Sequence, residues 1–272
     1  MKKEFRIFFT ALMFLTRLPV PKTTDHNPDY LQKAAKYFPM IGWVVGIICG
    51  LTFAAGNFLS TPIAAVLCII AGLVTTGAFH EDGFADSCDG FGGGWTKEKI
   101  LTIMKDSRLG TFGVAGLIMI LLLKYFLLVH IALQITNSNW HLSSLEKFSY
   151  PALVIIAAHT ASRWMPLLLI QNYSYVFQED ISKSKPLASA KLRFVEILFA
   201  FLVMLVPMLF LPLPYLASIA PMILVSFLLA QFFKKWIGGY TGDCLGAVQQ
   251  VTEITFLLSI VILNKYWLTC LL

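Results

Sequence analysis

FGVAGLIMILLLKYFLLVHIAL, residues 112–133, is the stretch that decides the fold. Its only charged side chain is Lys124, and a helix of this length crosses a hydrocarbon core of about 30 Å. Since it lacks the period-two alternation of a transmembrane barrel strand, we interpret it as a membrane-spanning helix. Six further windows have the same character: 39–59, 62–79, 150–170, 194–213, 216–233 and 245–268.

The composition of the whole chain agrees with this interpretation. Of the 272 residues, 57% are hydrophobic and 13% are charged, about half the charged share of a typical soluble domain. We therefore predict an all-α, polytopic integral membrane protein, with one domain over residues 1–272 and about seven transmembrane helices. The apolar segment 5–20 is short, contains Arg6 and Arg17, and ends in Leu-Pro-Val-Pro, so we expect an N-terminal interfacial or re-entrant helix there.

The basic residues indicate the topology. Seventeen of the 21 Lys and Arg fall before the first window or in alternate loops, while the other loops and the tail hold two. Under the positive-inside rule the N-terminus is cytoplasmic, as are the loops at about 80–111 and 234–244. The net charge of +6 is thus explained by topology, and we expect no nucleic-acid partner. The five cysteines form no CxxC pair, so we expect no disulfide framework or zinc site.

The first motif is HEDGFADSCDGFGGG, residues 80–94. If the helix of window 62–79 continues into it, a turn of about 100° per residue places Asp82, Asp86 and Asp89 on one face. Carboxylates in register predict a cation, and hard oxygen ligands suit Mg²⁺ or Mn²⁺. The glycines of this stretch would let backbone approach a ligand closely. The alternative is a solvated acidic helix end followed by a flexible glycine loop.

The second motif is IMKDSRLGTFG, residues 103–113, which places Lys105 and Arg108 beside Asp106, Ser107 and Thr111. This mixture could clamp a phosphate and position a hydroxyl; the alternative is a positive-inside anchor.

The third motif is GGYTGDCLG, residues 238–246. Here Asp243 is expected either as the N-cap of the last helix or as part of the metal cluster, with Thr241 and Gly242 at a helix N-terminus that can receive an anion. Because all three motifs fall on the cytoplasmic side, we expect them to meet in space.

Several polar side chains fall inside the apolar windows. Lys124 should face a partner or a cavity, but the sequence does not identify that partner. His159 and Arg163 could reach an anionic substrate or simply face the bundle interior. Glu253, with Gln249 and Gln250, could support the site or hold helices together.

These motifs, with FLTRLPVPK at residues 14–22, resemble cobalamin synthase, the adenosylcobinamide-GDP ribazoletransferase family. The resemblance implies a multi-pass enzyme of a bacterial or archaeal cytoplasmic membrane, with its active site facing the cytoplasm. Such an enzyme joins adenosylcobinamide-GDP to α-ribazole or its 5′-phosphate, releases GMP and uses Mg²⁺. The implied partners are these two substrates and the lipid bilayer, and a homo-oligomer or other corrinoid-assembly enzymes are further possible partners.

The resemblance also implies roles for individual residues. The predicted metal ligands are Glu81, Asp82, Asp86 and Asp89, although family members often carry an apolar residue at the position of Glu81. The predicted catalytic residues are Asp82, Asp86, Asp89, Asp106, Arg108 and Asp243, with Asp106 or Asp243 orienting or deprotonating the acceptor hydroxyl. The predicted substrate-binding residues are Arg17, His80, Lys105, Ser107, Arg108, Thr241 and Gly242.

Two other functions compete with this one. A CDP-alcohol-type lipid phosphotransferase also clusters aspartates at a membrane surface, but its DGxxAR and GxxxDxxxD pattern does not occur here. A secondary transporter would carry ionisable residues near the bilayer midplane and matching halves, whereas here the acids cluster beyond a predicted span.

Overall fold

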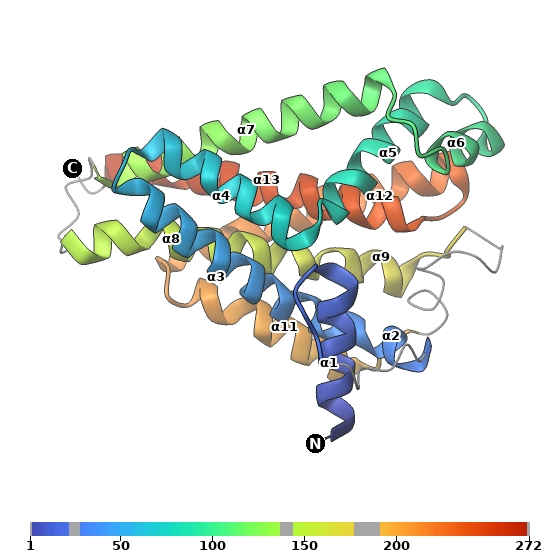
Figure 1. The fold of residues 1–272 in the computed structure, drawn as a ribbon, viewed down its shortest axis with the longest axis horizontal. Coiled ribbons are helices and arrows are strands. Elements are labelled where there is room, and N and C mark those ends of the chain that lie inside the picture. The colour runs from blue at the N-terminus through green and yellow to red at the C-terminus, as the bar shows by residue number, and fades with distance from the viewer. Residues whose placement is uncertain (1, 22–27, 137–143, 177–190, 271–272) are drawn as a thin grey trace.

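The structure, a computed structural model, describes residues 2–21, 28–136, 144–176 and 191–270. These residues form a helical bundle (Figure 1), which confirms the all-α prediction; the β-pairing among them is one isolated bridge between Tyr175 and Tyr240. The elements are α1 (Lys2–Leu15), α2 (Pro28–Ala34), η1 (Ala35–Tyr37), α3 (Phe38–Asn57), α4 (Thr61–Thr76), α5 (Phe79–Gly93), α6 (Lys97–Met104), α7 (Thr111–Thr136), α8 (Ser144–Trp164), α9 (Pro166–Asn172), α11 (Phe194–Met208), η2 (Leu213–Ser218), α12 (Ile219–Ile237) and α13 (Gly242–Cys270).

Five helical stretches of the described chain are long and apolar enough to cross a membrane: Tyr30–Asn57, Thr111–Ile135, Ser149–Asn172, Leu213–Ile237 and Gly242–Tyr266. The pair α4 and α5 would make a sixth span if counted as one broken helix. Window 194–213 contains α11, a shorter apolar helix. The polytopic class is thus confirmed, while length and composition support five or six spans rather than about seven.

The expected continuation of the second helix into the acidic motif is wrong. α4 begins at Ser60, whose hydroxyl accepts a hydrogen bond from the Ile63 N–H, and it ends at Gly77. Gly77 and Ala78 both adopt left-handed backbone, with φ of +64° and +56°, and α5 leaves at 90° to α4. Glycine accepts this conformation without a Cβ penalty, so the chain turns where the apolar pattern gave no break. Arg17 closes the bend, because its N–H donates to the Thr75 carbonyl at 2.8 Å and its side chain lies against Gly77.

A stripe of glycines joins α3 to α8. Gly42, Gly46 and Gly50 are spaced four apart and face the α8 backbone: a Cβ on Gly46 would come within 2.7 Å of the Ile156 Cα. Small residues at this spacing let two membrane helices approach closely, which replaces the hydrophobic driving force that lipid removes. This contact holds α8, and therefore His159 and Arg163, against α3.

The N-terminal helix α1 lies across the direction of the long helices (Figure 1). Its inner face, with Ile7, Ala11 and Leu15, is buried. Lys36 Nζ pairs with Glu4 Oε2 of α1 at 2.9 Å and with Glu196 Oε1 of α11 at 3.6 Å. A short helix crossing the bundle agrees with the expected interfacial helix, and its position relative to lipid stays a prediction.

Candidate active site

The acidic face of α5 opens into a cavity of about 240 Å³. Glu81, Asp82 and Asp86 line it from α5, and Ser107 lines it from the connection before α7. Its other walls are apolar: Leu73, Ala78, Ala85, Leu109, Leu117 and Leu121. The structure thus brings three of the predicted metal ligands together with the second motif. The region predicted as a loop at 80–111 is largely helical, since α5 and α6 occupy most of it.

The charges in this cavity repel one another. α5 lies outside the five spanning helices, and Asp86 on it is half-buried; burial, followed by the charges of Asp243, Asp82 and Asp89, raises the pKa of Asp86 to about 7. A bound cation would relieve that repulsion. The structure therefore combines several carboxylates with an electrostatic reason for a positive ion.

The donor set fits Mg²⁺. Glu81 is buried, and its Oε1 accepts a hydrogen bond from Gln250 Nε2 at 2.9 Å, while its Oε2 has no hydrogen-bond partner. Among the described residues, no three His, Cys, Asp or Glu side chains lie close enough to hold a metal by themselves. Mg²⁺ characteristically keeps several waters, binds one or two carboxylates and completes its shell with substrate phosphates, and Glu81, Asp82 and Asp86 line one cavity that could supply those one or two carboxylates.

Asp89 is engaged differently from the other acids. Its carboxylate accepts hydrogen bonds from the N–H groups of Gly110 at 2.7 Å and Gly113 at 2.8 Å. These amides are at the N-terminus of α7, where N–H groups have no intrahelical acceptor. Asp89 thus fastens α5 to the start of α7, and this contact holds the second motif beside the acids.

Gly83 of the first motif and Gly246 of the third lie in a close helix contact, and the expected approach of backbone to a ligand at the glycines of the first motif stays a prediction. A Cβ on Gly83 would come within 3.0 Å of the Asp243 Cα, and one on Gly246 within 3.0 Å of the His80 carbonyl oxygen. The two helices are therefore in close contact where α13 begins. This contact brings Asp243 to the acidic helix, as the predicted meeting of the motifs requires.

Asp243 is not the N-cap of α13. The cap is Thr241, whose hydroxyl accepts a hydrogen bond from the Cys244 N–H at 3.3 Å, and Asp243 is in the first turn. Threonine two residues earlier satisfies the free N–H in the usual way. The Asp243 carboxylate is thereby left available to the acidic cluster, with Thr241 Oγ1 donating to its Oδ2 at 3.4 Å.

The second motif contains a tight ion pair. Arg108 Nη2 donates to Asp106 Oδ2 at 2.7 Å, and the Arg108 backbone N–H donates to Asp106 Oδ1 at 3.1 Å. The hydrogen bonds from Arg108 lower the pKa of Asp106 to about 2, so Asp106 is a poor proton acceptor at neutral pH. The Arg108 side chain remains 88% exposed, and Lys105 beside it is exposed as well.

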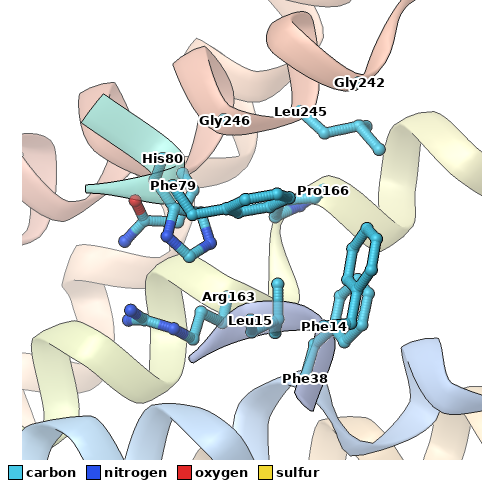
Figure 2. A pocket seen from close by; sticks show the side chains of 11 residues that line it. Phe14, Leu15, Phe38, Phe79, His80, Arg163, Pro166, Gly242, Leu245 and Gly246 are labelled. Atoms are coloured by element: carbon cyan, nitrogen blue, oxygen red, sulfur yellow. The ribbon is translucent and has the colours of Figure 1, made fainter. Parts of the chain in front are cut away.

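A second hollow is lined by residues of α1, α3, α5, α8, α9 and α13 (Figure 2). His80 and Arg163 form its polar end, and both are buried with one unpartnered nitrogen each, Nδ1 of His80 and Nε of Arg163. Phe14 and Phe38 lie together on another wall, and the Phe79 ring lies beside His80 (Figure 2). Gly242, a predicted substrate-binding residue, also lines this hollow.

The bundle interior supplies the partners that the sequence could not name. Lys124 of α7 pairs with Glu253 of α13, their Nζ and Oε1 atoms 2.5 Å apart, and His159 Nδ1 is 3.4 Å from Glu253 Oε2. Gln249 Nε2 donates to Glu253 Oε2 at 2.7 Å, and Gln250 Nε2 donates to Gln249 Oε1 at 2.9 Å. Together with the Gln250–Glu81 bond, these contacts form a polar chain from the bundle core to the acidic cavity. The adjacent glutamines in an otherwise apolar helix were the sequence signal for it.

Comparison with known protein sequences identifies the family of this chain. The family model described as "Cobalamin-5-phosphate synthase" matches residues 7–261. An adenosylcobinamide-GDP ribazoletransferase of Shewanella frigidimarina is 43% identical over 262 residues, covering 93% of this chain and 92% of the relative. One of Leptospira interrogans with the same name is 40% identical over 271 residues, covering 96% and 97%. No solved structure matches the chain. A family match over nearly the whole length, with relatives of this identity, shows that the chain belongs to the cobalamin synthase family of adenosylcobinamide-GDP ribazoletransferases.

Proposed function

We propose that the chain is a Mg²⁺-dependent transferase that joins adenosylcobinamide-GDP to α-ribazole or α-ribazole 5′-phosphate and releases GMP. The observation that carries the metal requirement is the cavity that Glu81, Asp82, Asp86 and Ser107 line together; in addition, the buried Glu81 Oε2 has no hydrogen-bond partner. Asp82 and Asp86, with Glu81, would hold Mg²⁺. When bound, the ion supplies charge neutralisation for the pyrophosphate of the donor.

The reaction is a displacement at phosphorus. A ribose hydroxyl of the acceptor forms a bond to the phosphorus nearer the corrin, the bond from that phosphorus to the bridging oxygen breaks, and GMP leaves with its electron pair. A 5′-phosphorylated acceptor can react only through a hydroxyl other than the 5′ one. Such a step needs positioning and neutralisation of charge more than covalent help from the protein.

The residues around the cavity divide these tasks. Lys105 and Arg108 are exposed beside the cavity wall that Ser107 forms, and they would neutralise the phosphate of the departing GMP. Arg17, at the α4–α5 bend, would contact an anionic part of the donor. Asp243 is our candidate for orienting the acceptor hydroxyl and taking its proton, because Asp106 is held by Arg108.

The basic residues support a cytoplasmic placement of this site. Lys97 and Lys99 belong to α6, and Lys234 and Lys235 belong to the last turn of α12, which contacts α6. Loops rich in Lys and Arg face the cytoplasm, and α5 and α6 lie at the same end of the bundle (Figure 1). We therefore propose a multi-pass protein of the cytoplasmic membrane with its active site on the cytoplasmic face.

The test is turnover by purified protein in detergent, supplied with adenosylcobinamide-GDP, α-ribazole and Mg²⁺, with GMP and the corrinoid product measured. Asp82→Asn and Asp86→Asn should lower turnover by about 100-fold or more and raise the Mg²⁺ concentration for half-maximal rate. Glu98→Gln, which changes an exposed acid on α6, is the matched control and should behave as wild type. Unchanged turnover and metal dependence in both Asp variants would refute the metal assignment. Turnover without a sealed vesicle also excludes a transporter as the explanation.

A further inference from the structure

The hollow in Figure 2 has the character of a ligand site, and the proposed chemistry leaves its interior unused. It is lined by eleven residues from α1, α3, α5, α8, α9 and α13. Binding sites for small molecules combine apolar and aromatic walls with a few polar groups that fix orientation. Here the polar groups are buried and unsatisfied: Arg163 is 2% exposed and His80 5%, yet each keeps a ring or guanidinium nitrogen without a partner.

Buried polar atoms are nearly always hydrogen-bonded, and an unpartnered one carries a desolvation penalty. Both unpartnered nitrogens belong to residues that line the same hollow, so a molecule bound there could supply their missing partners. Arg163 Nη1 already donates to the His159 carbonyl at 3.0 Å, so the guanidinium is held while its Nε–H stays free to donate. The hollow therefore combines two buried polar side chains that lack partners with aromatic rings, of which Phe79 contacts the His80 ring edge to face at 5.4 Å between ring centroids.

The geometry points to this hollow as the subsite for the flat aromatic base of the nucleoside acceptor, a benzimidazole in the case of a ribazole. This inference rests on the proposed function. The apolar edge of the base stacks among Phe14, Phe38 and Phe79, and its unsubstituted ring nitrogen accepts a hydrogen bond at the polar end. Stacking of a base on aromatic side chains does not need a particular base-edge pattern.

The other base in the reaction, guanine, suits this hollow less well. Guanine has two polar acceptors and an amino group on its edges, and it needs hydrogen-bond acceptors for its N–H groups. The lining residues include no carboxylate, and the Oε1 of Gln249 already accepts from Gln250. The walls thus match an apolar base with a single ring acceptor.

The position of the hollow connects the base to the reaction. His80 at its polar end is followed directly by Glu81 and Asp82, which line the acidic cavity, and Gly242 on its wall precedes Asp243. We therefore expect the ribose of a bound base to point toward His80 and Gly242, the lining residues that are next in sequence to the acids.

One ring must move for the base to bind. The open space among the side chains is about 30 Å³, which has room for ordered water but not for a base of two fused rings. Phe79 is 42% exposed and contacts Phe14 edge to face at 5.2 Å between ring centroids. Phe79 turns outward on binding and then covers the base, which makes it the ring whose removal most affects acceptor binding.

The experiment compares Phe79→Leu and Phe14→Leu with Phe227→Leu, a matched control on an exposed face of α12. Steady-state turnover of the purified full chain gives KM for α-ribazole and, separately, for adenosylcobinamide-GDP. Loss of one stacking ring should raise KM for α-ribazole about 10-fold, with KM for the corrinoid and the Mg²⁺ requirement unchanged. The control should keep all three values.

Several results would overturn the assignment. Equal rises in both KM values, or a shifted Mg²⁺ requirement, would mean that the substitutions merely disturb α5. An unchanged KM for α-ribazole in both variants would place the base elsewhere. Equilibrium dialysis of α-ribazole against wild-type protein, with guanosine and inorganic phosphate as competitors, adds a further check. Displacement of α-ribazole by guanosine would assign the hollow to the donor. Displacement by phosphate would make the hollow an anion site.

The two proposals can fail separately. If wild-type protein releases GMP but the KM values do not divide as described, the subsite is wrong and the function stands. If wild-type protein releases no GMP, the proposed function fails, and the dialysis alone then tests the subsite. Weaker α-ribazole binding in both Phe variants would support the subsite, and unchanged binding would overturn it.

Discussion

Replacing Lys124 by methionine will destabilise the bundle by leaving Glu253 without its cation. The Lys124 Nζ and Glu253 Oε1 atoms are 2.5 Å apart, and the two side chains are 7% and 2% exposed. At an effective dielectric constant of about 20, two unit charges at this distance attract by about 7 kcal/mol, and much of that is offset by the cost of removing both charges from water. The pair is therefore worth little net, but removing one partner leaves a buried charge unpaired, which costs about 3 kcal/mol.

A double-mutant cycle compares the cost of removing one partner of the Lys124–Glu253 pair with the cost of removing both. The free energy of unfolding is obtained from detergent denaturation in mixed micelles for wild type, Lys124→Met, Glu253→Gln and the double variant. We expect each single variant to lose about 3 kcal/mol and the double variant to lose about 4 kcal/mol, because the second change removes the charge that the first left alone. Lys99→Met, an exposed lysine on α6, is the control. Additive losses, or single losses within about 0.5 kcal/mol of the control, would refute the reasoning.

Three further outcomes follow from contacts described above. Gly46→Ala should lower the thermal unfolding midpoint, because its Cβ would come within 2.7 Å of the Ile156 Cα, whereas Gly93→Ala, whose Cβ meets only Ile103 Cδ1 at 3.4 Å, should not; equal midpoints would contradict the close α3–α8 contact. Asp89→Ala should lower the free energy of unfolding by about 2 kcal/mol, because two hydrogen bonds are lost, and should speed amide exchange at Gly110 and Gly113. Unchanged exchange would show that these two hydrogen bonds do not hold the start of α7. The Mg²⁺ affinity should rise about tenfold from pH 6 to pH 8, because Asp86, with its pKa of about 7, is protonated at the lower pH and ionised at the higher. This pH dependence should vanish in Asp86→Asn. A Mg²⁺ affinity that does not change with pH in wild type would contradict the metal assignment.

The class of the fold could be read from stretches such as 112–133, because length and hydrophobicity decide whether a helix can span a bilayer. The bend between α4 and α5 could not. It requires a left-handed conformation at Ala78 as well as at Gly77, and alanine gives no sequence signal for that conformation. The apolar window 62–79 therefore ran through the break at Gly77 and Ala78, and nothing in the sequence indicated a turn there.

The acidic face was predictable for a local reason. Asp82 and Asp86 belong to one helix, so their register depends only on the helical period and survives the error about what precedes it. The role of Asp89 depends on where the backbone of Gly110 and Gly113 returns. The partner of Lys124 depends on how α7 and α13 pack. Both are tertiary facts, and a single sequence contains no measure of either distance.

The bend also explains why the acids can lie beside polar groups of the bundle core. A straight continuation of α4 would carry α5 away at the angle of α4, whereas the 90° turn sets α5 against α13 through Gly83 and Gly246. Only in that contact can Gln250 reach Glu81, and Gln250 is bonded through Gln249 to Glu253. Glu81 thus has one carboxylate oxygen fixed by α13 and the other without a hydrogen-bond partner, in a residue that lines the cavity. The same buried chain that balances Lys124 in the bundle therefore orients one edge of the proposed metal site, and the left-handed backbone at Gly77 and Ala78 makes both possible.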